Sequence, residues 1–213
     1  MAVPRIKICG INDPAALEAA IAARAEYAGF NFFPPSPRCL TPHQAAALGT
    51  HAGSRITKVG VFADAGDAAI AEAIEAARLD AAQLHGSETP ERAAQVKGRF
   101  GIPVWKVVSV SVPGDVEKAA AYEDAADFIL FDAKTPKGAL PGGMGLVFDW
   151  GLLSTYRGRL PWGLAGGLTP ENVAEAVRIT GAPLVDTSSG VESAPGVKDV
   201  DKIAAFCKAV SRC

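Results

Sequence analysis

Short apolar runs alternate along this chain with Ala- and Glu-rich stretches. The runs are rich in β-branched and aromatic residues and have the length of strands, about four to eight residues. Most of the stretches between them have helical spacing of apolar positions, as in 14–21, 68–78 and 171–180. The pattern predicts a strand followed by a helix, repeated along the whole chain. The predicted strands lie near residues 5–10, 29–33, 56–62, 81–85, 103–109, 127–132, 161–165 and 184–188.

Several predicted helices begin with a capping residue followed by proline. The side-chain oxygen of the first residue caps the backbone N–H groups of the first turn. The fixed φ of proline suits the first helical position. These dipeptides therefore mark where helices start. They are Asp13-Pro14, Thr41-Pro42, Thr89-Pro90 and Thr169-Pro170.

Eight strands with helices between them predict a closed parallel barrel. Strands that are joined by helices pair in parallel, and closure leaves no exposed sheet edge. An open doubly wound sheet is the alternative, but the turn after the first strand, residues 9–13, lacks the glycine fingerprint of dinucleotide-binding sheets. With 213 residues and 49% hydrophobic content the chain can bury a full core. We expect an α/β fold, one (β/α)₈ TIM barrel over residues 1–213.

Charge and composition narrow the classes of partner. The 21 basic and 23 acidic residues give a net charge of −2 without a basic block, which argues against a nucleic-acid partner. No apolar run approaches the roughly 18 residues of a membrane span. Neither C-x-x-C pairs nor a disulfide-dense pattern occurs, so we expect a reducing, cytoplasmic compartment. The three histidines are scattered, so we predict no metal site.

Two residues at predicted strand ends carry candidate chemistry. Alternation along the first strand places Lys7 and Cys9 on the inward face, where the charge of Lys7 would favour the Cys9 thiolate. The same alternation makes Asp132 the uppermost inward residue of the sixth strand. A lone buried cysteine is usually an apolar filler, and an aspartate at a strand end is often a cap. Together, at one barrel mouth, they predict a base and an acid facing one pocket.

The loops at the same mouth contain further candidates. Glycine-bearing turns follow the seventh and eighth strands, at 164–170 and 186–191, the frequent phosphate position of such barrels. Arg38 could hold a carboxylate or be a solvated surface charge. His85 is either a substrate contact or a satisfied structural group. Asp186 could accept a hydrogen bond from the ligand or orient its own loop.

These segments together resemble the phosphoribosylanthranilate isomerase family, and the resemblance extends over nearly the whole chain in order. The matching segments in the first half are Lys7-Ile8-Cys9-Gly10-Ile11, Gly29-Phe30-Asn31-Phe32-Phe33, Ser36-Pro37-Arg38, Val59-Gly60-Val61-Phe62 and Gln83-Leu84-His85-Gly86. Those in the second half are Asp132-Ala133, Gly142-Gly143, Phe148-Asp149-Trp150, Leu164-Ala165-Gly166-Gly167-Leu168, Pro170-Glu171-Asn172-Val173, Ser188-Ser189-Gly190-Val191-Glu192 and Pro195-Gly196-Val197-Lys198-Asp199.

The resemblance implies an enzyme of tryptophan biosynthesis that converts N-(5-phosphoribosyl)anthranilate to its 1-deoxyribulose isomer. It implies that Asp132 is the general acid and Cys9 the general base, with no metal or organic cofactor. Arg38 would then meet the anthranilate end, with Lys7, His85 and Asp186 as the other substrate-site residues. The phosphate would be bound by Gly166, Gly167, Ser188, Ser189 and Gly190. The partner is a small-molecule substrate, and both a monomer and a homodimer remain open.

One position departs from the family pattern. The family usually has threonine where Met144 stands in Gly142-Gly143-Met144-Gly145. The hydroxyl is lost, and methionine could instead pack over the apolar ring of the ligand. Two alternatives to the isomerase remain. One is a sister phosphate-binding barrel, such as indole-glycerol-phosphate synthase or the tryptophan synthase α chain. The other is a phosphosugar-binding barrel without turnover.

Overall fold

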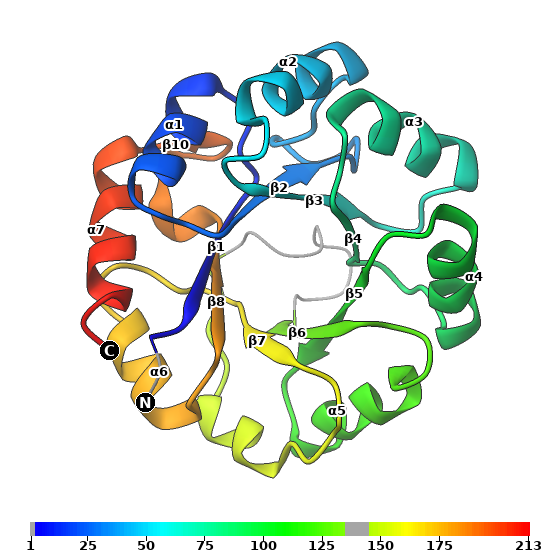
Figure 1. The fold of residues 1–213 in the computed structure, drawn as a ribbon. Coiled ribbons are helices and arrows are strands. Elements are labelled where there is room, and N and C mark those ends of the chain that lie inside the picture. The colour runs from blue at the N-terminus through cyan, green and yellow to red at the C-terminus, as the bar shows by residue number, and fades with distance from the viewer. Residues whose placement is uncertain (1–2, 135–144) are drawn as a thin grey trace.

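The computed structural model describes residues 3–134 and 145–213, and its centre is a closed eight-stranded barrel (Figure 1). Every neighbouring pair of barrel strands is parallel, and β8 pairs with β1 to close the ring. The predicted α/β barrel is therefore confirmed, each strand within about two residues of its expected position. The strands are β1 (Arg5–Cys9), β2 (Tyr27–Asn31), β3 (Thr57–Phe62), β4 (Ala81–Leu84), β5 (Val104–Val110), β6 (Phe128–Ala133), β7 (Trp162–Leu164) and β8 (Leu184–Thr187).

Helices form a ring around the barrel, and short 3₁₀ turns complete it (Figure 1). A small antiparallel hairpin of β9 and β10 lies outside the barrel sheet, between β8 and α7. The helices are α1 (Pro14–Ala22), α2 (Pro42–Ala52), α3 (Asp67–Ala77), α4 (Pro90–Phe100), α5 (Pro113–Glu117), α6 (Val173–Thr180) and α7 (Val200–Val210). The other elements are η1 (Lys118–Tyr122), η2 (Trp150–Thr155), η3 (Ser189–Val191), β9 (Glu192–Ala194) and β10 (Val197–Lys198).

Three of the four predicted helix starts are confirmed. The side chains of Asp13, Thr41 and Thr89 each accept a hydrogen bond from a backbone N–H in the first turn of α1, α2 and α4. The fourth, Thr169-Pro170, is wrong, because α6 begins only at Val173. Thr169 instead belongs to the turn after β7, where its N–H donates to the Asn172 side chain at 2.8 Å. The Asn172 amide also donates to Gly167 O at 2.9 Å, so this turn fixes the glycine loop rather than starting the helix.

The direction of side chains along β1 and β6 matches the predicted alternation. Ile6 and Ile8 belong to the large core cluster between barrel and helices. Phe128 and Leu130 belong to the smaller cluster that fills the barrel interior, together with Trp105 of β5. Lys7 points inward as well, since its buried ammonium group donates to Asp186 of the neighbouring strand β8, which lines the pocket. The inward positions of β1 and β6 therefore lead up to Cys9 and Asp132.

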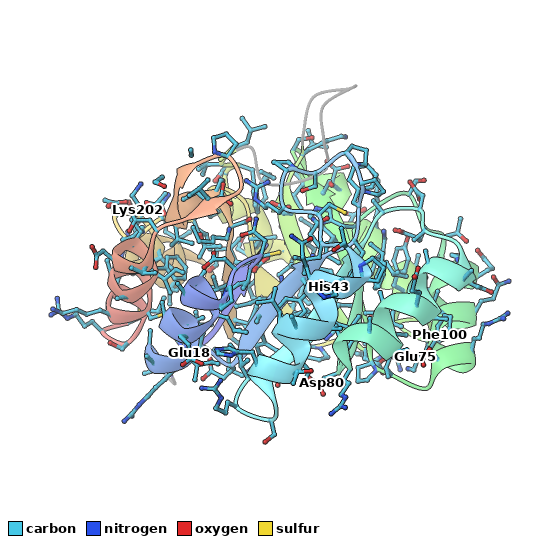
Figure 2. All side chains as sticks on the ribbon, turned by 90° about the horizontal axis from the view of Figure 1, so that it is seen from above. Glu18, His43, Glu75, Asp80, Phe100 and Lys202 are labelled. Carbon is cyan, nitrogen blue, oxygen red and sulfur yellow. The ribbon has the colours of Figure 1, made fainter. Side chains whose placement is uncertain are left out.

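Charged side chains lie on the outer surface, around the helices and turns that cover the barrel. In Figure 2 the exposed side chains of Glu75, Asp80 and Lys202 project from the helices and turns around the barrel. Within the described ranges 3–134 and 145–213, no helix is long and apolar enough to cross a membrane. The expectation for Gly142, Gly143 and Met144 lies outside the described residues.

Candidate active site

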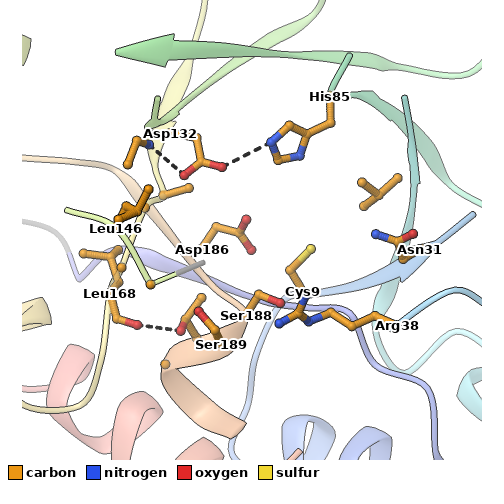
Figure 3. A pocket seen from close by; sticks show the side chains of 18 of the residues that line it. Cys9, Asn31, Arg38, His85, Asp132, Leu146, Leu168, Asp186, Ser188 and Ser189 are labelled. Atoms are coloured by element: carbon orange, nitrogen blue, oxygen red, sulfur yellow. Dashed lines mark hydrogen bonds and ion pairs between the residues drawn. The ribbon is translucent and has the colours of Figure 1, made fainter. Parts of the chain in front are cut away.

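A pocket opens at the carboxyl ends of the barrel strands, where parallel barrels hold their functional groups (Figure 3). Its wall contains nearly all of the predicted site residues. They are Cys9, Arg38, His85, Asp132, Gly166, Gly167, Asp186, Ser188, Ser189 and Gly190. The exception is Lys7, which is fully buried and does not line the pocket.

Cys9 closes β1 and is almost buried, with 9% of its surface exposed. The glycine at position 29 makes room for it, because a Cβ there would lie 2.9 Å from the Cys9 Sγ and 3.1 Å from the Lys7 Nζ. Burial raises the pKa of the Cys9 thiol, while the charges of Lys7 and Lys198 oppose that rise. Lys7 thus acts in the predicted direction, but desolvation outweighs the lysine charges, so the net shift of the Cys9 pKa in the free pocket is upward.

Lys7 and Asp186 form a buried ion pair on adjacent strands. Their side chains meet at 3.0 Å, and their Cα atoms are register partners in the β1–β8 ladder. Burial is the largest single effect on Lys7 and lowers its pKa, but Asp186 and Cys9 together outweigh burial, so the Lys7 pKa is raised. Burial also raises the pKa of Asp186, partly offset by Lys7. The pair therefore lies beneath Cys9, with Asp186 forming the part that reaches the pocket wall.

Asp132 stands at the end of β6, and both of its carboxylate oxygens have partners. Oδ1 accepts a hydrogen bond from the Ala133 N–H at 2.8 Å, and Oδ2 lies 3.2 Å from His85 Nε2 (Figure 3). The other ring nitrogen of His85 lies 3.3 Å from the Gln83 amide nitrogen. His85 lines the pocket and also contacts Asp132, so its position fits both of the roles that the sequence left open.

The two glycine turns form one continuous part of the wall. Gly166 and Gly167 have φ values of 88° and 61°, a region that favours glycine. A Cβ at Gly166 would also lie 2.6 Å from Ala133 N and 3.0 Å from Asp132 Oδ1. The Thr187 hydroxyl donates to Leu168 O at 2.7 Å, which joins the turn after β7 to the turn after β8. Backbone at these positions can approach an anion closely.

Arg38 reaches the pocket from the loop after β2. Its Nε and Nη2 each donate to one carboxylate oxygen of Glu192 at 2.7 Å, a two-point pairing that fixes the plane of the guanidinium. Glu192 is a residue that site prediction from sequence missed. The sequence did contain a signal for Glu192, because this residue ends Ser188-Ser189-Gly190-Val191-Glu192, one of the segments that resemble the family. Asn31, at the end of β2, also lines the pocket and was not predicted.

Several acid–base groups lie together in this pocket. Across the described parts of the chain, no group of three or more His, Cys, Asp or Glu side chains is arranged to hold a metal ion. The wall combines a thiol, a carboxyl group in contact with an imidazole, a guanidinium and two glycine turns. This set can transfer protons at one end of a ligand while holding anionic groups at its other ends.

Known proteins provide an independent comparison. Residues 6–209 match the family model of N-(5'-phosphoribosyl)anthranilate (PRA) isomerase. The chain is 56% identical to N-(5'-phosphoribosyl)anthranilate isomerase from Paramagnetospirillum magneticum, over 96% of this chain and 95% of the relative. It is 54% identical to the enzyme of that name from Paracoccus denitrificans, over 94% of both chains.

Solved structures agree with this family. The phosphoribosyl anthranilate isomerase from Thermotoga maritima superposes with a TM-score of 0.89 at 36% identity, covering 99% of this chain and 100% of that one. A phosphoribosyl anthranilate isomerase in complex with reduced 1-(o-carboxyphenylamino)-1-deoxyribulose 5-phosphate gives a TM-score of 0.86 at 34% identity, covering 99% and 100%. With this fold, this pocket and these relatives, the chain belongs to the N-(5'-phosphoribosyl)anthranilate isomerase family.

Proposed function

We propose that this chain, as a single catalytic domain, isomerises N-(5-phosphoribosyl)anthranilate to 1-(2-carboxyphenylamino)-1-deoxyribulose 5-phosphate in tryptophan biosynthesis. The observation that carries the proposal is the presence of Cys9 and Asp132 in the wall of one pocket, in a chain of this family. An Amadori rearrangement needs an acid that protonates the ribose ring oxygen and a base that removes the proton from C2, the carbon next to the imine. Neither step calls for a metal or an organic cofactor.

Asp132 is the proposed general acid. It gives a proton to the ribose ring oxygen, the bond from that oxygen to C1 breaks, and the nitrogen lone pair forms the imine. The Ala133 N–H at 2.8 Å and the His85 ring at 3.2 Å hold the carboxyl group in one orientation. That fixed orientation lets the proton be transferred without reorganising the site.

Cys9 is the proposed general base. As thiolate it removes the proton from C2, the electrons of that bond form the enolamine, and tautomerisation gives the ketone. The Lys7 ammonium beneath it favours the charged form, and Lys198 acts in the same direction. Because burial works against the thiolate, these cations limit the free-energy cost of forming it.

The ends of the substrate are assigned to the walls beside these two groups. Arg38 is proposed to bind the carboxylate of the anthranilate ring, since guanidinium matches carboxylate geometry. The phosphate is assigned to Gly166, Gly167, Ser188, Ser189 and Gly190, which lie in the two turns after β7 and β8. Asp186 and His85 add further polar side chains to the wall. A cytoplasmic location and a monomer or homodimer stay predictions.

The first test is turnover. Purified protein at catalytic concentration is mixed with N-(5-phosphoribosyl)anthranilate, and the fluorescence of the anthranilate conjugate is followed. We expect the signal to fall to completion at a rate proportional to enzyme concentration. If the ligand binds but its fluorescence decays only at the uncatalysed rate, the chain is a phosphosugar-binding barrel and the proposed activity is wrong.

The thiol of Cys9 provides a prediction on pH. Its pKa in the free protein is expected to lie above the ordinary value of 9.0, because burial disfavours the thiolate. The thiol form therefore predominates at neutral pH, and kcat/KM is expected to rise with pH along a limb set by Cys9. The ultraviolet absorbance of the thiolate, measured as the difference between the protein and its Cys9→Ser variant, reports the titration directly. A Cys9 thiolate already formed at pH 7 in the free protein would contradict this.

A further inference from the structure

The β9–β10 hairpin contacts residues of the pocket wall through the side chains of Glu192 and Lys198. Glu192 begins β9 and is only 8% exposed. Its two oxygens take the Nε and Nη2 donors of Arg38, both at 2.7 Å. One of these oxygens also accepts from the Lys198 Nζ at 2.8 Å. Two cations from different segments therefore meet on a single buried carboxylate.

Lys198 extends this connection to the second glycine turn. Its Nζ donates to the Ser188 carbonyl oxygen at 3.0 Å and lies 3.3 Å from the Ser188 hydroxyl. Glu192 is thus linked directly to Arg38 and, through Lys198, to Ser188. Figure 3 shows Arg38 and Ser188 together at one side of the pocket, next to Cys9.

The hairpin itself is fixed to the barrel at several points. The Lys202 Nζ of α7 donates to Glu192 O at 2.7 Å, and the Asn12 amide donates to Gly196 O at 2.9 Å. Gly196 has a φ of 79°, and a Cβ there would lie 2.7 Å from Pro37 O. The hairpin turn therefore packs against the residue that precedes Arg38. Glu192 cannot shift independently of the loop that it holds.

We propose that Glu192 is a positioning residue that fixes the plane of the Arg38 guanidinium at the pocket wall, and with it the site of the ring carboxylate. The inference rests on the proposed function, in which Arg38 binds the carboxylate of the anthranilate ring. A two-point pairing through Nε and Nη2 holds the guanidinium in one plane.

The test is Glu192→Gln, which keeps the size of the side chain but removes its charge. Losing charge-assisted hydrogen bonds is expected to raise KM for the anthranilate ribotide by about tenfold or more, with kcat within about threefold. The inhibition constant of inorganic phosphate, a probe of one end alone, is expected to change less than threefold. A role in folding alone would lower the melting temperature and the active fraction but leave KM unchanged.

The chain offers a matched control in Glu18→Gln. Glu18 also binds one arginine with both oxygens, Arg55 at 3.1 and 2.7 Å, but on the outer surface away from the pocket. That variant is expected to keep both KM and kcat. Glu192→Asp retains the charge with a shorter arm, so it covers the case in which Glu192→Gln fails to fold, and its KM is also expected to rise.

The outcomes separate this inference from the proposed function. If the unchanged protein does not turn over the ribotide, the proposed function fails first. If it does, and both Glu192 variants fold with KM within threefold of that protein, the positioning role is overturned and the isomerase activity stands. A parallel rise in the phosphate inhibition constant would also overturn it, because the effect would then not be confined to the carboxylate end of the ligand.

Discussion

Asp132→Asn is expected to lower kcat for the anthranilate ribotide by about a thousandfold, within the range that a positioned general acid contributes. The amide keeps the shape of the carboxyl group and can still meet Ala133 and His85, but it has no acidic proton for the ring oxygen. Because the acid acts on the transition state and not on the anchors of the substrate, affinity for a product analogue should stay within about tenfold. Steady-state kinetics and equilibrium titration provide the two readouts.

A matched control is Asp80→Asn. Asp80 is a half-exposed carboxylate that binds the Lys58 side chain at 2.9 Å and its backbone N–H, outside the pocket. We expect this variant to keep kcat even if it is less stable. The acid assignment would be refuted if Asp132→Asn lost affinity for the analogue as strongly as it lost turnover, or if it kept more than a tenth of kcat.

Cys9→Ser is expected to have the second largest effect, a fall in kcat of about a hundredfold. Serine fills nearly the same volume, but its hydroxyl gives up its proton far less readily than a thiol, so the base is lost. KM should change little, because Cys9 holds neither anionic end. The measurement is kcat at saturating substrate together with the pH profile of kcat/KM, in which the rising limb set by Cys9 should disappear.

Cys39→Ser provides the corresponding control. Cys39 lies in the loop after β2, and its thiol contacts only the neighbouring Leu40 carbonyl at 3.7 Å among its described hydrogen bonds. The Cys39→Ser variant should keep full activity. A Cys9→Ser variant with unchanged kcat would instead favour a barrel whose base is a lysine or glutamate, as in the sister phosphate-binding enzymes.

Most of the fold was predictable because each strand and helix has its own local signal. The alternation of apolar runs gave the eight barrel strands, and inward alternation placed Cys9 and Asp132 at the mouth. Thr169 shows the limit of such signals. A capping residue before proline has the same sequence at a helix start and in a turn. Here the Thr169 hydroxyl accepts a hydrogen bond from the Glu171 N–H, and the Thr169 N–H donates to the Asn172 side chain, but α6 begins only at Val173.

The site was less predictable wherever a property depends on packing. The Lys7 side chain points inward, as the alternation predicts, but only the fold shows that Asp186 pairs with it below the pocket. The pKa direction of Cys9 depends on burial, which sequence spacing does not contain. Glu192 lies 154 positions from Arg38, and no local pattern joins residues so far apart in sequence.

The most direct test of the central claim is a crystal structure of the chain with reduced 1-(o-carboxyphenylamino)-1-deoxyribulose 5-phosphate. We predict that the sugar chain lies between the Cys9 Sγ and the Asp132 carboxyl group, with the phosphate at the turns of Gly166 and Ser188 and the ring carboxylate at Arg38. A ligand that places its phosphate at Arg38, or that leaves the thiol and the carboxyl group on the same side of the sugar, would contradict the account.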